Sequence, residues 1–126
     1  MNAYTEPVTN PTLINVYSQG TKESRESVTN KITEELRGTG YSAASTTLEQ
    51  AKKTYKHSNW KNCIEYALTI QDVLKKNGVD SQIEIVKGGY EEHAIIRFEE
   101  NGKIITYSNG KIVPNMKYSG NGRIVR

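Results

Sequence analysis

The sequence predicts an α+β domain, in which N-terminal helices and a central helix pack on an antiparallel meander of strands. Up to Gly78 the apolar residues recur at helical spacing, and after it they alternate with a period of two. Asn-Gly pairs then separate the strands, and this dipeptide is a strong hairpin signal. A chain of 126 residues suits one domain. We expect an irregular lead-in over residues 1–22 and a single domain over 23–126, with its core in 45–126.

The first helix is expected from Ser24 to Arg37, after a lead-in that holds two prolines and at most a short extended piece at 13–17. Apolar residues return every four positions in this helix, and glycines end it. These residues are Val28, Ile32 and Leu36, followed by Gly38 and Gly40. The apolar stripe is narrow, so the helix is expected to pack at an edge of the core.

Two further helices are expected before Gly78. Thr46-x-x-Glu49 has the pattern of a capping box and predicts a helix through Tyr55. Ser58 or Asn59 is then expected to cap a central helix over 60–77. Gly78 closes this helix, and its apolar face includes a tryptophan expected to anchor the core. The face consists of Trp60, Cys63, Ile64, Ala67, either Ile70 or Gln71, and Leu74.

The strands follow Gly78. The segment 82–87 alternates, with Ile83 and Ile85 inward, and 93–98 is the most apolar and therefore central. Asn101-Gly102 is expected to turn the chain into a strand at 103–107. The remaining expected elements are a turn at Asn109-Gly110, a strand at 111–113, a turn at Asn121-Gly122 and a strand at 124–125.

Composition excludes several function classes. No run of 18 apolar residues is present, which argues against a membrane span, and residues 1–20 are too polar for a signal segment. A single cysteine excludes an internal disulfide and a cysteine-cluster zinc site, and we expect no cofactor and no metal. The net charge is +3, and residues 101–126 hold five basic and no acidic residues. This basic tail suits either RNA contact or a solvated end, and the two readings stay open.

The candidate chemistry centres on Cys63 and His93. A thiol attacks as the thiolate, and the free N–H groups of a helix N-terminus stabilise negative charge. Cys63 is expected in the first turn of the central helix, and His93 opens a strand that faces this helix. A histidine beside the sulfur would take its proton and later return a proton to the leaving group. The pair therefore predicts a cysteine nucleophile with its base, against the alternative that Cys63 is core filler.

Such sites also need a residue that orients the imidazole and donors for an oxyanion. The strand after His93 ends at Tyr107-Ser108-Asn109, so Asn109, or Ser108 in its place, is the expected orienting residue. His57 and Asn59, upstream of the cysteine, are side-chain candidates for the oxyanion donor.

Residues 55–112 resemble the papain-fold toxin domains at the C-termini of large bacterial polymorphic and contact-dependent growth inhibition toxins. The resemblance lies in Asn62-Cys63, Ala67-Leu68, His93-Ala94-Ile95-Ile96 and Tyr107-Ser108-Asn109-Gly110. Ser108 stands where these families often have Asp, and the usual glutamine before the nucleophile is absent.

The resemblance implies a papain-like core and a toxin that acts in the cytoplasm of a competing bacterium after delivery from the producing cell. It also implies a cognate immunity protein as partner and leaves room for an activator protein of the target cell. A monomer is expected. The first hypothesis is a protease or deamidase acting on an amide, with Cys63, His93 and Asn109 as catalytic residues.

The second hypothesis is a ribonuclease toxin that cleaves tRNA or another RNA, because fold does not dictate chemistry. His93 would then act as acid or base on the RNA 2′-OH, and Cys63 would belong to the core. The residues expected to help are Tyr90, Arg97, Thr106 or Tyr107. A third hypothesis is a non-catalytic interaction module, in which His93 has no chemical role.

Overall fold

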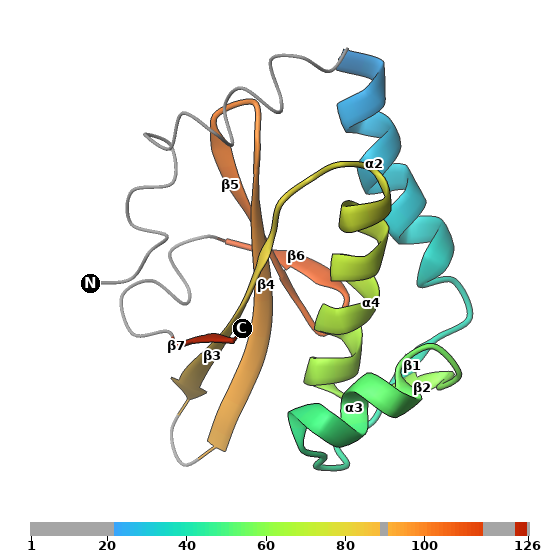
Figure 1. Ribbon diagram of the computed structural model, residues 1–126, viewed down its shortest axis with the longest axis vertical. Helices are drawn as coiled ribbons and strands as arrows, with labels where there is room; N and C mark the ends of the chain where they lie inside the picture. Colours follow the sequence, from blue (N-terminus) through green and yellow to red (C-terminus); the bar gives the residue numbers. More distant parts are fainter. Residues whose placement is uncertain (1–21, 89–90, 115–122, 126) are drawn as a thin grey trace.

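In the computed structural model the described helices lie on one side of an antiparallel sheet (Figure 1). The structure describes residues 22–88, 91–114 and 123–125. The α+β class expected from the sequence is confirmed. In chain order the elements are α2 Lys22–Glu35, β1 Gly40–Tyr41, α3 Leu48–Thr54, β2 Trp60–Lys61, α4 Cys63–Lys76, β3 Gln82–Gly88, β4 Glu91–Glu100, β5 Lys103–Ser108, β6 Lys111–Val113 and β7 Arg123–Val125.

The large sheet has the strand order β6-β5-β4-β3-β7, and all of its pairs are antiparallel. β4 is central, as its apolar sequence predicts. The turns at Asn101-Gly102 and Asn109-Gly110 form as expected, and all four residues have the positive φ that a tight hairpin turn requires. β7 crosses to the far edge and pairs with β3, whereas the expected turn at 121–122 and extended piece at 13–17 lie outside the described residues.

The core lies between α4 and the sheet, and α2 packs on the other side of α4 (Figure 1). Side chains from α4 meet alternate residues of the central strands, since successive residues of a strand point to opposite faces. The principal buried members are Ala67, Ile70 and Leu74 of α4, Ile83 of β3, Ala94, Ile96 and Phe98 of β4, Tyr107 of β5, and Val28 and Ile32 of α2. As predicted, Ile83 points inward and the apolar residues Val28, Ile32 and Leu36 of the first helical segment pack against the core.

The start of the central helix differs from the prediction. Asn62 is the N-cap, and its side chain and that of Glu65 form a reciprocal capping box, so α4 begins at Cys63 rather than at Trp60. Trp60 and Lys61 instead form β2, which pairs in parallel with β1. The tryptophan is 70% exposed, and its predicted role as a core anchor is therefore wrong. The capping box of α3 begins at Thr47, one residue after the predicted Thr46.

The end of α4 is as predicted. Gly78 has φ +73 and occupies the position just past the C-cap. Its N–H donates to the Lys75 carbonyl, and the Val79 N–H donates to the Leu74 carbonyl at 2.9 Å. These two bonds define a Schellman motif, and Leu74 and Val79 are both buried, which gives the motif its hydrophobic contact.

Gly110 and Gly102 offer a matched test of this packing. Both have positive φ, +81 and +77, but a Cβ at Gly110 would lie 2.8 Å from the Tyr66 ring, whereas one at Gly102 meets nothing within 4 Å. Gly102→Ala should cost about 1–2 kcal/mol from the backbone alone, and Gly110→Ala should cost distinctly more. Denaturant unfolding of both variants checks this; equal losses would show that the ring moves aside freely.

Candidate active site

Cys63 is the first residue of α4 and is half-buried against the core. Its Sγ accepts the backbone N–H of Ala94 at 3.5 Å. β5 pairs with β4 only as far as Ile95–Ser108, because the chain then turns at Asn109. The sulfur thus lies on the helix side of the sheet, beside the peptide that joins His93 to Ala94.

His93 directly precedes Ala94 on β4. Ala94 is buried in the core beneath α4, and strand alternation points the Cβ of His93 to the opposite side of the strand. The ring is half-buried, and its Nε2 forms a hydrogen bond with the Ser108 Oγ at 2.7 Å. Ser108 stands opposite Ile95, two residues beyond the histidine, and therefore shares its face.

The structure places three of the predicted site residues around the same stretch of β4. The Cys63 sulfur accepts the N–H of Ala94, and His93, the residue before Ala94, forms a hydrogen bond with Ser108. Ser108, the alternative orienting residue, is the one that contacts His93. Asn109 occupies the turn with φ +50, and its Oδ1 is buried without a hydrogen-bond partner among the described residues.

The other auxiliary candidates differ from Ser108 in their surroundings. Tyr107 points into the core, where its ring stacks on Phe98 with centroids 6.1 Å apart. Burial, with a smaller contribution from Glu100, raises the pKa of Tyr107 to about 12. Tyr107 therefore stays protonated at neutral pH. His57 and Asn59 are exposed in the loop between α3 and β2, on the helix side. Tyr90 lies outside the described residues.

The face that carries His93 is rich in buried charge. The Arg97 Nε lies 3.5 Å from a Glu84 carboxylate oxygen, and both side chains are at most 1% exposed. Thr106 stands opposite Arg97 in the register. Sequence reasoning identified Arg97 and Thr106 and missed the acids, although strand alternation from His93 would have found Glu99. We call this set the polar face: His93, Arg97 and Glu99 on β4, with Glu84, Thr106 and Ser108 on its neighbours.

Lys111 adds an accessible cation next to Ser108, the hydrogen-bond partner of the imidazole. It stands opposite Ser108 in the pairing of β5 with β6, so the two side chains share a face. Lys111 is exposed, Ser108 is nearly buried and His93 is half-buried. The polar face therefore opens toward solvent at this end, whereas Arg97 and Glu84 lie behind it.

Within residues 22–88, 91–114 and 123–125, no group of three histidine, cysteine or acidic residues is arranged to hold a metal ion. No helix in this described part combines the length and the apolar character needed to cross a membrane. A scan against protein-family models finds no match to this chain. A comparison with curated proteins likewise finds no match. The papain-like core expected from the resemblance therefore stays a prediction.

The polar face predicts an unusual pH dependence of stability. Burial raises the pKa of Glu99 above its usual range, so the folded state holds the proton at pH values where the unfolded chain, with a pKa of about 4.3, has lost it. The free energy of unfolding that this residue contributes is complete at low pH and is lost as the pH rises through the raised pKa. Glu99→Gln should remove that loss and make the variant progressively more stable than the parent as the pH rises.

Guanidinium unfolding of both proteins between about pH 4 and pH 8 measures the difference. Glu49→Gln changes an exposed carboxylate on α3 and is the matched control. A constant difference between Glu99→Gln and the parent at every pH would contradict the expectation.

Proposed function

We propose that this domain is a ribonuclease that acts as the toxin effector of a bacterial competition system, with His93 as its acid–base group. The observation that carries the proposal is the half-buried imidazole on the polar face, bonded to Ser108, which stands opposite the exposed Lys111. The toxin role rests on the sequence resemblance over residues 55–112. An immunity protein as partner and action inside a target bacterium belong to the same proposal.

His93 suits proton transfer because an unperturbed imidazole titrates near neutral pH. In the proposed reaction it accepts the proton of a ribose 2′-OH, and the O2′ attacks the adjacent phosphorus in line. The bond from phosphorus to O5′ breaks, and O5′ leaves with a proton from water. The products are a 2′,3′-cyclic phosphate and a 5′-OH end. Neither a cofactor nor a redox change enters this balance.

The neighbours of the imidazole have separate roles in this scheme. Ser108 is a positioning residue, because its hydroxyl bonds the ring Nε2 at 2.7 Å. Lys111 is exposed beside it and can neutralise the phosphate, as cations do in most nucleic-acid contacts. Arg97 and Glu84 are buried, so they act on the site through their charges rather than by touching RNA.

The amide hydrolase with Cys63 as nucleophile is the second candidate. What favours it is the sulfur at the N-terminus of α4, with a backbone N–H donating to it at 3.5 Å. The sulfur also contacts the peptide that follows His93, so the amide hydrolase draws on the same region of β4. The ribonuclease is placed first because it needs only the imidazole and its neighbours and does not depend on a reactive thiol.

The ribonuclease proposal predicts that His93→Ala lowers RNA cleavage by about 10²–10⁴-fold, the usual worth of general acid–base catalysis. Cys63→Ala should leave the rate within about twofold, because the sulfur takes no part. Total bacterial RNA and purified tRNA are incubated with each protein, and the product ends are analysed by mass spectrometry. DNA of the same sequence as a cleaved RNA should stay intact, since it lacks the 2′-OH.

Expression in a bacterium distinguishes the two candidates. The ribonuclease predicts growth arrest with RNA loss that depends on His93 and not on Cys63. Growth arrest that requires Cys63 while cellular RNA stays intact would refute it in favour of the amide hydrolase. If His93→Ala arrests growth like the parent, neither enzyme is correct and the interaction module remains.

A further inference from the structure

A cavity of about 610 Å³ lies on the helical side of the molecule. Its walls come from the C-terminal half of α2, the loop between α3 and β2, and the outer side of α4. Its volume falls in the range of small-molecule sites. We call it the helical cavity. The polar face lies on the other side of the sheet, so the two regions are separated by the core of the protein (Figure 1).

Cations outnumber acids in the lining of the helical cavity. Five basic residues line it: Lys31, Arg37, Lys56, Lys61 and Lys76. Three acidic residues also line it, namely Glu34, Glu35 and Asp72. The excess of two positive charges favours an anionic ligand.

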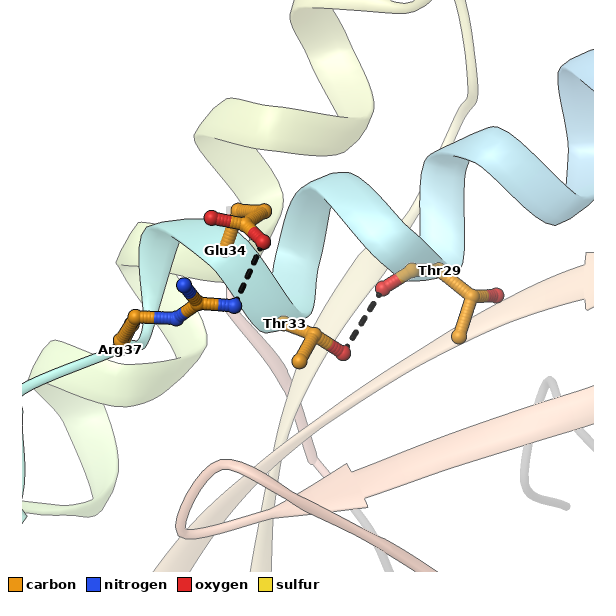
Figure 2. A network of polar contacts seen from close by, with 4 residues as sticks. All are labelled: Thr29, Thr33, Glu34 and Arg37. Carbon is orange, nitrogen blue, oxygen red and sulfur yellow. Dashed lines mark hydrogen bonds and ion pairs between the residues drawn. The ribbon is translucent and has the colours of Figure 1, made fainter.

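Two of these acids already have partners among the described residues. The Arg37 guanidinium donates to the Glu34 carboxylate at 2.7 Å on the surface of α2, as Figure 2 shows. The Asp72 carboxylate accepts the Tyr55 hydroxyl at 3.2 Å. The Arg37–Glu34 pair removes one charge of each sign, so the excess of two positive charges remains. The exposed cations of the lining outside this pair are Lys31, which donates to the Asn77 side chain, and Lys56 and Lys76.

The most buried cation of the lining is Lys61, which is 4% exposed. Its Nζ donates to the Tyr55 carbonyl, which occupies one of its three N–H donors. Burial lowers the pKa of Lys61, while Glu65 and Glu35 oppose this change. An anion in the cavity would likewise stabilise the ammonium form. A buried ammonium that borders a polar cavity is typical of sites that bind oxyanions.

We propose that the helical cavity binds a small ligand bearing two or more phosphate groups, such as a nucleoside diphosphate or triphosphate. Lys61 would contact it from inside the cavity, while Lys56 and Lys76 would contact it from the rim. Ser58 and Asn59 supply neutral hydrogen-bonding groups on the same wall. The proposal is independent of the ribonuclease reaction, because it uses no residue of the polar face.

The test is isothermal titration of the whole domain with pyrophosphate, ATP and adenosine at one fixed, low ionic strength. Pyrophosphate and ATP should bind and adenosine should not. Lys56→Ala, Lys76→Ala and Lys61→Met should each weaken pyrophosphate binding by about tenfold, the usual worth of one charge-assisted contact. Lys75→Ala is the matched control, because Lys75 is an exposed neighbour on α4 that does not line the cavity.

The outcomes separate clearly. No binding of pyrophosphate or ATP, or a loss with Lys75→Ala equal to that with Lys76→Ala, would overturn the proposal. If Lys61→Met fails to fold, the pyrophosphate affinities of Lys56→Ala and Lys76→Ala decide the result. A 2′-O-methyl oligonucleotide, which cannot be cleaved through its 2′ oxygen, tests RNA as the source of phosphate. Tighter binding of this oligonucleotide than of ATP, weakened by the same three variants, would overturn the proposal of a small ligand and assign the cavity to an RNA strand.

Discussion

The buried capping box at the start of α4 is the constraint on which the rest of the structure depends. The Asn62 Oδ1 accepts the Glu65 N–H at 2.9 Å, and the Glu65 carboxylate accepts the Asn62 N–H at 3.1 Å. Both residues also hold other segments: Asn62 Nδ2 donates to the Ala44 carbonyl and the Thr46 hydroxyl, and Glu65 accepts the Thr54 hydroxyl of α3. This hydrogen-bond network satisfies the N-terminus of α4 and also connects it to the segment 44–46 and to α3, which an isolated cap cannot do.

The capping box determines where α4 begins on the sheet, and therefore which strand residues the side chains of its first turn contact. With the helix starting at Cys63, its first turn brings the sulfur to the Ala94 N–H and the Tyr66 ring against Gly110. Ala94 faces the helix, and strand alternation gives the Cβ of His93 the opposite direction. The position of the thiol beside the peptide that joins His93 to Ala94 is therefore a consequence of where the helix begins.

Most of the fold could be predicted from local signals, and the failures are instructive. Gly78 and the two Asn-Gly turns are correct because each position requires a positive φ that few other residues tolerate. The start of α4 was missed because Ser58, Asn59 and Asn62 are all good caps; only Asn62 has an acid three residues later. For α3 the adjacent Thr46 and Thr47 both begin a capping-box pattern, so sequence alone could not choose between them.

The candidate site was harder to predict, because it depends on pairings between strands. His93, Arg97 and Thr106 were found from their residue types, yet the ion pair with Glu84 follows from the register of β3 against β4. The alternation of β4 is hard to read from the sequence, because Ala94, Ile95 and Ile96 are consecutive apolar residues although Ile95 shares the face of His93.

The polar face is costly for stability, and this argues that it has a role beyond folding. Burying a carboxylate or a guanidinium costs several kcal/mol that an ion pair only partly offsets. Hydrophobic residues of similar volume at positions 84, 97 and 99, in place of Glu84, Arg97 and Glu99, would give the folded protein at least the same stability. Buried charges of this kind cluster at functional sites, where they tune a neighbouring group. Here that neighbour is His93, at the end of the face that opens to solvent, and the hydrophobic layer under α4 isolates it from the helical cavity.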